Sequence, residues 1–136
     1  MRSATGWLVV CLIAVSIVAA CSSSDPARSA AERFVDAYYV EINLPRARDE
    51  SVGLARAKVE DQIRLLGEQP VAEASSRPSV HYTFLEQQAG DAERDRRGFL
   101  FELMISLGGD ALTRRALVTV RNDGDGWRAA NFQEID

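Results

Sequence analysis

The chain has 136 residues, with 16 basic residues, 20 acidic residues and a net charge of −4 at neutral pH. This mildly acidic balance argues against a nucleic-acid-binding protein, since the sequence has no basic patch with interleaved aromatic residues. The part of the chain after residue 20 is long enough for one domain with one hydrophobic core, but not for two.

The first 20 residues have the organisation of a secretory signal peptide. Arg2 and the α-amino group supply positive charge, residues 7–18 are apolar except for Ser16, and Ala19-Ala20 are small residues before a cleavage point. An uncleaved membrane anchor is the less favoured alternative, because a spanning helix needs about 20 apolar residues. We expect residues 1–20 to be a signal peptide, residues 21–25 a tether and residues 26–136 a single domain.

The four residues Val18-Ala19-Ala20-Cys21 resemble the lipobox of bacterial lipoproteins. This resemblance implies cleavage before Cys21 and attachment of lipid to its sulfur, so that the chain is exported and bound to a membrane. Because Ser22 follows the cysteine, the resemblance implies the outer membrane facing the periplasm in a Gram-negative cell, and otherwise the cell membrane. Cys11 would leave with the signal peptide, so the domain would retain no cysteine and no disulfide.

The first predicted helix begins at Pro26 with Asp25 as its N-cap. It continues to about Ile42 and ends at Asn43-Leu44-Pro45, because a residue before proline disfavours helix. Its apolar stripe recurs at helical spacing in Ala27, Ala31, Phe34, Tyr38 and Ile42, with Ala30 and Val35 beside it.

A second helical stretch is predicted over residues 46–66. Gly53 is an expected break within it, and Gly67 is an expected left-handed residue at its end. The expected apolar stripe consists of Val52, Ala55, Val59, Ile63 and Leu66.

Residues 69–79 are interpreted as a connector with room for one short helical turn. After it the hydrophobic period changes to two, which predicts strands over residues 80–85, 99–107, 112–121 and 127–135. In a regular strand Trp127 and Phe132 would point to opposite faces of the sheet, because an odd number of positions separates them. A β-bulge in the last strand would allow both to face the core. On the clearest strand the expected core face is Phe99, Phe101, Leu103, Ile105 and Leu107. The predicted fold class is α+β, with N-terminal helices packed on a curved antiparallel sheet of four or more strands.

The helix segment 34–39, the long strands and the segment 125–132 resemble the nuclear transport factor 2-like (cystatin-like) superfamily. This resemblance implies a sheet that curves around a helix to form a cone with a pocket. Some members of the superfamily are isomerases or dehydratases that use a pocket Asp, His or Tyr, and many dimerise through their sheets. The usual extra strand between the early helices is not evident, unless it lies in residues 70–74.

The candidate catalytic residues are Glu102, Asp36 and His81, and the candidate ligand-binding residues are Tyr38, Tyr82 and Met104, with Tyr39 beside them. Each has a structural alternative, because Tyr38 lies on the helix stripe and strand alternation already places Glu102 on a polar face. His81 is the only histidine, which excludes a histidine cluster for metal, and we expect no metal and no cofactor. The turn at 122–126 lacks the spacing and the distal glutamate of a calcium loop.

Several arginines suggest an anion-binding cluster, but acidic residues lie among them in the sequence. The arginines are Arg94, Arg96, Arg97, Arg114 and Arg115, and the acidic residues are Asp91, Glu93, Asp95 and Asp110. The favoured function is a lipid-anchored envelope protein whose domain binds a small apolar molecule or a protein partner without catalysis. The alternatives are a pocket enzyme of isomerase or dehydratase type and a structural homodimer.

Overall fold

The computed structural model describes residues 25–67, 77–88 and 95–136. The predicted signal peptide, the cysteine that we expect to be lipidated and the strand considered at 70–74 lie outside these residues. The described elements, in chain order, are α1 (Pro26–Val35), the π-helix η1 (Asp36–Val40), α2 (Leu44–Asp49), α3 (Gly53–Leu66), β1 (Ser79–Gln88), β2 (Arg96–Leu107), β3 (Asp110–Asn122) and β4 (Trp127–Ile135).

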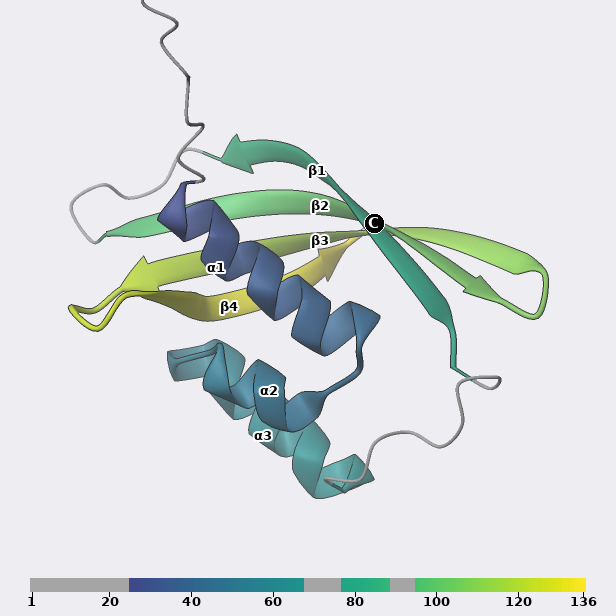
Figure 1. The fold of residues 1–136 in the computed structure, drawn as a ribbon, viewed down its shortest axis with the longest axis horizontal. Helices are drawn as coiled ribbons and strands as arrows, with labels where there is room; N and C mark the ends of the chain where they lie inside the picture. Colours follow the sequence, from purple (N-terminus) through teal and green to yellow (C-terminus); the bar gives the residue numbers. More distant parts are fainter. Residues whose placement is uncertain (1–24, 68–76, 89–94) are drawn as a thin grey trace, which may run out of the picture.

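The four strands form one antiparallel sheet in the order β1-β2-β3-β4, and the helices lie on one side of it (Figure 1). Helix α1 crosses this covered face, while α3 packs beside β4. The predicted α+β class and the four predicted strands are confirmed. Within the described residues, no helix has both the length and the apolar character needed to cross a membrane.

Helix α1 begins as the sequence predicts. The Asp25 side chain accepts a hydrogen bond from the backbone N–H of Ala27 at 3.1 Å, and Pro26 opens the helix. The buried residues are the predicted stripe, namely Ala27, Ala30, Ala31, Phe34 and Val35.

The predicted continuation of this helix to Ile42 is wrong in its last turn. From Asp36 the helix widens into η1, and the Glu41 N–H donates to the Asp36 carbonyl at 2.8 Å. The Asn43 N–H then donates to the Ala37 carbonyl at 2.8 Å, which closes the helix end with Ile42 at a φ of 51°. A β-branched residue is strained in this left-handed conformation.

The second helical stretch is divided at the predicted break, because Gly53 has a φ of 55°. Helix α2 starts two residues earlier than expected, with Asn43 as its N-cap. Between α2 and α3, the Val52 N–H donates to the Ala129 carbonyl at 2.8 Å, and the Ala129 N–H donates to the Glu50 carbonyl at 3.0 Å. This short parallel pairing covers part of the outer edge of β4.

The core lies between the covered face and the helices. Phe34, Phe99, Phe101 and Leu103 are fully buried, which confirms most of the predicted core face of β2. Leu107, predicted to be on that face, is instead 56% exposed, because the β2–β3 hairpin extends beyond the helices (Figure 1).

Two further predictions concern the last residue of the α3 stripe and the bulge in β4. Leu66, predicted to face the core from α3, is 66% exposed. The predicted bulge in β4 is confirmed, since Thr119 pairs with Asn131 and Val120 pairs with Ala129, which leaves Ala130 as the extra residue.

Candidate functional site

The structure separates the predicted site residues onto the two faces of the sheet. Asp36 and Tyr82 meet on the covered face, where Tyr38 also packs. Strand register places His81 opposite Met104, and Thr83 opposite Glu102, on the uncovered face. The candidates therefore do not converge on one site.

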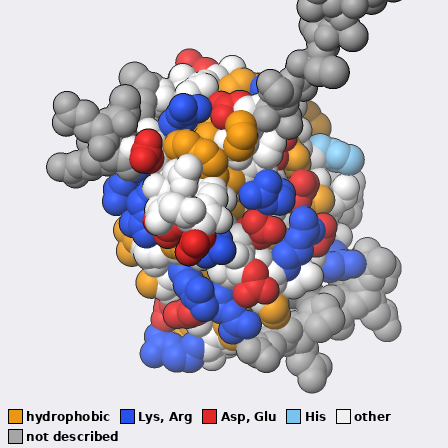
Figure 2. Space-filling model, turned by 60° about the vertical axis from the view of Figure 1, so that its left-hand side comes forward, with side chains coloured by type: hydrophobic (Ala, Val, Ile, Leu, Met, Phe, Trp, Pro, Cys, Tyr) orange, Lys and Arg blue, Asp and Glu red, His pale blue; other side chains and the backbone are white. Residues whose placement is uncertain are grey.

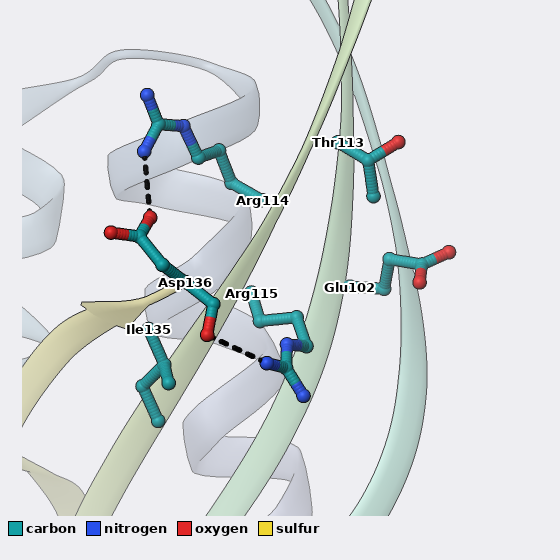
Figure 3. Close-up of a pocket in the computed structure, with 6 residues that line it drawn as sticks. All are labelled: Glu102, Thr113, Arg114, Arg115, Ile135 and Asp136. Atoms are coloured by element: carbon teal, nitrogen blue, oxygen red, sulfur yellow. Dashed lines mark hydrogen bonds and ion pairs between the residues drawn. The ribbon is translucent and has the colours of Figure 1, made fainter.

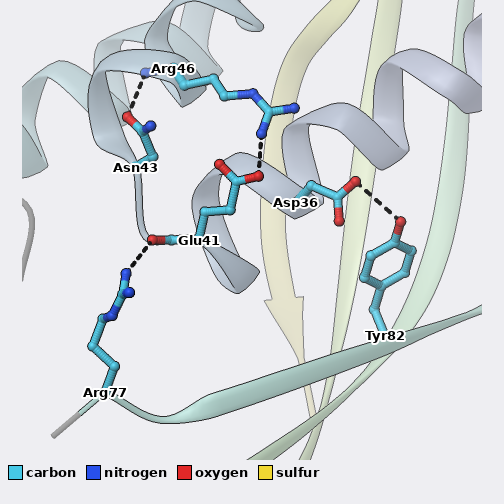
Figure 4. A network of polar contacts seen from close by, with 6 residues as sticks. All are labelled: Asp36, Glu41, Asn43, Arg46, Arg77 and Tyr82. Carbon is cyan, nitrogen blue, oxygen red and sulfur yellow. Dashed lines mark hydrogen bonds and ion pairs between the residues drawn. The ribbon is translucent and has the colours of Figure 1, made fainter. Parts of the chain in front are cut away.

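Asp36 and Tyr82 form a polar contact at the rim of the covered face (Figure 4). The Tyr82 hydroxyl donates to Asp36 Oδ2 at 3.4 Å. Burial raises the pKa of the Asp36 carboxyl, while the hydrogen bond from Tyr82 and the charge of Arg46 act in the opposite direction. Burial, followed by the negative charge of Asp36, raises the pKa of the Tyr82 hydroxyl.

The other contacts in Figure 4 tie three chain segments together at this rim. The Arg46 guanidinium forms an ion pair with Glu41, and the Arg46 backbone N–H donates to Asn43 Oδ1 at 3.1 Å. The Arg77 guanidinium donates to the Glu41 carbonyl at 3.1 Å. These contacts hold the end of η1, the start of α2 and the segment before β1 in place, which is a structural role.

Tyr38 and Tyr39 belong to the packed interior. Tyr38 stacks on Phe34 with ring centroids 5.6 Å apart and contacts Phe132 at 4.7 Å. The buried Tyr39 hydroxyl has no hydrogen-bond partner among the described residues, and burial strongly raises its pKa. Tyr38 thus takes part in an aromatic cluster of the core, as its place on the helix stripe predicts.

The uncovered face contains a shallow groove of about 150 Å³ that includes Glu102 (Figure 3). Strand register brings Glu102 of β2 opposite Arg115 of β3, which in turn lies opposite Ile135 of β4. Opposite charges on neighbouring strands stabilise a sheet slightly. The complete lining is Glu102, Thr113, Arg114, Arg115, Ile135 and Asp136.

Asp136 closes one side of this groove. Arg114 and Arg115 point to opposite sides of β3, and both contact Asp136 (Figure 3). The Arg115 guanidinium donates to the Asp136 carbonyl at 2.8 Å, and Arg114 Nη1 lies 3.0 Å from Asp136 Oδ1. The sequence identified Glu102 and the arginines, but it did not associate them with Ile135 and Asp136, because only strand pairing brings β4 to β3.

His81 and Met104 lie outside the groove lining. His81 is exposed, and its ring contacts Ser79 Oγ at 3.5 Å. Met104 is 49% exposed and lies opposite Thr113 of the groove. The described parts of the chain contain no group of three or more residues suited to hold a metal ion.

The candidate acid–base residues lie on both faces of the sheet. Glu102 and His81 lie across the sheet from Asp36 and Tyr82, so these groups cannot act on one small substrate. The space beneath the helices contains packed aromatic and aliphatic side chains, which include Phe34, Phe101 and Phe132. By contrast, the groove offers a cation, an anion and an apolar side chain to solvent.

No protein-family model matches the chain, and no curated protein matches it. Among solved structures, a multiply substituted variant of a protein named Rd1NTF2_05 aligns with a TM-score of 0.55 and 13% identity, over 82% of this chain and 97% of that one. A protein named "Rd1NTF2_04 with long sheet" aligns with a TM-score of 0.52 and 14% identity, over 80% of this chain and 99% of that one.

A third structure, of the intermembrane space region of the chloroplast protein ARC6, aligns with a TM-score of 0.42 and 15% identity, over 80% of this chain and 95% of that one. The first two proteins carry the nuclear transport factor 2 label in their names and share the helix and sheet arrangement described above. At such low identity the likeness concerns the fold alone. The chain therefore has a nuclear transport factor 2-like α+β fold.

Proposed function

We propose that the chain is a lipid-anchored protein of the bacterial cell envelope, whose domain binds a polypeptide partner without catalysis. The lipobox-like Val18-Ala19-Ala20-Cys21 supports the anchor, with lipid on Cys21. The observation that carries the binding function is the groove on the uncovered face of the sheet.

The size of the groove favours a polypeptide over a buried small molecule. Pockets that enclose drug-sized ligands measure about 300 to 1,000 Å³, whereas this groove measures about 150 Å³. It is large enough for one or two side chains of a partner. Glu102 and Arg115 supply opposite charges, and Ile135 with the nearby Met104 supplies apolar surface.

The anchor is tested by replacing the lipidated residue. Cys21→Ser removes the sulfur to which lipid would be attached, so we expect the protein to leave the membrane fraction of its host. The measurement is fractionation combined with the intact mass of the processed chain. A wild-type chain without acyl mass, or a variant that still sediments with membranes, would refute lipidation.

The binding surface is tested by photo-crosslinking in the native host. A photoreactive residue at Thr113 in the groove is expected to yield an adduct with another polypeptide, and Arg115→Glu in the same chain is expected to abolish it. The matched control places the photoreactive residue at Ala57, which is exposed on α3.

The identity of the adduct separates the alternatives. A different polypeptide supports the proposal, whereas a second copy of this chain identifies the structural homodimer. A retained small molecule in native mass spectrometry, with no adduct from Thr113, would replace the proposal by small-ligand binding. If that molecule were turned over and Glu102→Gln stopped its turnover with the fold intact, the chain would be a pocket enzyme.

A further inference from the structure

Three arginines form a row across one end of the uncovered face. Strand register places Arg96 of β2 directly opposite Arg121 of β3, and Arg121 directly opposite Arg128 of β4. Side chains that face each other on neighbouring strands have Cβ atoms about 5 Å apart, and like charges in these positions destabilise a sheet. We call these three residues the arginine row.

The arginine row forms no ion pair within the described part of the chain, although Asp95, Asp123 and Asp125 lie in the adjoining segments. None of its members forms an ion pair or a side-chain hydrogen bond with another described residue. Moreover, the Nε of Arg121 is buried and has no acceptor there. A buried guanidinium N–H without an acceptor is costly, so an anion near Arg121 would have to be bound by its Nη groups.

The start of α3 adds further donors beside Arg121. The Arg121 guanidinium nitrogens lie 3.7 and 3.9 Å from the position that a Cβ on Gly53 would occupy. The N-cap of α3, Val52, makes no side-chain hydrogen bond to the first turn, so the backbone N–H groups there lack a side-chain cap. The N-terminus of a 14-residue helix carries partial positive charge, which reinforces the attraction of an anion.

The arginine row lies at the end of the sheet where the predicted tether joins the domain. Asp25, the last tether residue, contacts Arg97 at 3.3 Å on the covered face. Arg97 is the neighbour in β2 of Arg96, whose side chain points to the uncovered face at the same end of the sheet. Figure 1 shows the start of α1 at the same end of the molecule as the start of β2 and the turn between β3 and β4. Figure 2, which brings this end forward, shows basic side chains in groups with acidic side chains between them.

The covalent chain limits how far this end can be from a lipid on Cys21. Asp25 follows Cys21 by four positions in the sequence, and an extended chain over four positions spans at most about 14 Å. If Cys21 is lipidated, this end of the domain therefore stays close to the membrane surface. The three guanidinium groups of the row, which form no ion pair with another described residue, would then lie near that surface.

We propose that the arginine row binds the phosphate groups of anionic phospholipids in the membrane to which the chain is anchored. This inference deepens the proposed function and rests on it, because the lipid anchor is what would bring the row to the bilayer. Guanidinium groups bind phosphate oxygens with charge-assisted, often bidentate hydrogen bonds. The contact would orient the domain so that the groove at the far part of the sheet stays accessible to a partner.

The test uses the chain from residue 21 onward, as the predicted cleavage would leave it, with Cys21→Ser, so that binding depends neither on lipid nor on the apolar residues 7–18. Its sedimentation is compared with vesicles of phosphatidylcholine alone and with vesicles that also contain phosphatidylglycerol. We expect preferential binding to the second kind, and loss of this preference with added salt. The combined variant carries Arg96→Gln, Arg121→Gln and Arg128→Gln. Each lost arginine should weaken binding about fivefold, so the affinity of this variant for the anionic vesicles should fall roughly a hundredfold.

The matched control removes the same charge elsewhere. Arg33→Gln, Arg56→Gln and Arg64→Gln replace three arginines that form surface ion pairs, and this variant should keep most of the preference. Equal losses in both variants would overturn the proposal, since net charge alone would then explain the binding. Arg96→Gln alone, at an exposed position, is the second variant in case the triple variant unfolds, and it should lose about fivefold.

Inorganic phosphate serves as the second probe. Saturable shifts of the arginine side-chain signals with phosphate, but no preference for anionic vesicles, would reassign the row to a free anion and overturn the lipid assignment. The intact mass of the processed wild-type chain reports on lipidation separately. Failure of the anchor and failure of the arginine row are therefore distinguishable.

Discussion

The two faces of the sheet are built from the same strands but have opposite properties. On the covered face, Phe99, Phe101 and Leu103 of β2 are fully buried under the helices. On the uncovered face, the intervening residues of the same strand include the groove residue Glu102 and the exposed Met104. The comparison shows that stability is concentrated on one face, which leaves the other face available for binding.

The uncovered face is nevertheless not uniformly polar. Leu100 is only 7% exposed although no described helix lies over it, and strand register places it opposite Leu117. Alternation along β2 is therefore less sharp than in a sheet with one fully solvated face. Such a face suits a partner that brings its own apolar side chains.

The largest expected difference between the faces concerns two residues of β2. Phe101→Ala should lower the free energy of unfolding by about 3 to 5 kcal/mol, because it removes a buried ring that contacts Tyr82 and Phe84. Met104→Ala on the uncovered face should change it by less than about 0.5 kcal/mol. Urea unfolding of both variants measures the difference, and equal losses would mean that the uncovered face is also packed.

A second test concerns the unpaired hydroxyl beneath the helices. Tyr39→Phe should raise the free energy of unfolding by about 1 kcal/mol, because it removes a buried hydroxyl without a partner among the described residues. Thermal unfolding monitored by circular dichroism measures this gain. Tyr38→Phe is the control, and a loss of stability in Tyr39→Phe would reveal a partner for that hydroxyl.

A third test follows the charge at the rim of the covered face. Burial raises the pKa of Asp36 in the folded protein above the ordinary value of 3.8, so its ionised form opposes folding. The wild-type protein should therefore gain stability as the pH falls from above the raised pKa to the ordinary value. Asp36→Asn should therefore be more stable than wild type at pH 7, and this advantage should vanish below the ordinary pKa. Urea unfolding across this pH range tests the sign, with exposed Asp49→Asn as the control. An advantage that does not depend on pH would contradict the assigned cause.

The smallest expected effect concerns the end of η1. Ile42→Gly should remove the strain of a β-branched residue at a φ of 51°, partly offset by the loss of its half-buried side chain. We expect the free energy of unfolding to change by less than about 1 kcal/mol in Ile42→Gly. Gly53→Ala is the contrasting variant. It should lower the free energy of unfolding by about 1 to 2 kcal/mol, because alanine is strained at the left-handed φ of 55°. Chemical unfolding of both variants separates the two effects. A large loss in Ile42→Gly would show that its side chain, rather than its backbone, determines that turn.

Local patterns in the sequence predicted most of the fold. The Asp25 cap, the break at Gly53, the four strands and the bulge near Ala130 follow from propensity and periodicity, which depend on residues close together in the chain. Two of the exceptions, Leu66 and Leu107, have the right periodicity but lie beyond the elements that would cover them. The other exceptions are the end of the first helix, which widens into η1, and the earlier start of α2. Hydrophobic period indicates which face a residue occupies, but it does not indicate whether another element reaches that face.

The sequence by itself predicted the fold class and named the residues able to take part in acid–base chemistry or binding, while the signal for export stays a prediction. Only the tertiary structure decided which of those residues meet. Asp36 and Tyr82 are 46 residues apart and touch, whereas Tyr82 and Glu102 lie on opposite faces of paired strands. The arginine row likewise depends on register, because a shift of one residue in any strand would turn its member to the other face. Register is fixed by the packing of the whole covered face, and that packing is a property of contacts distant in sequence.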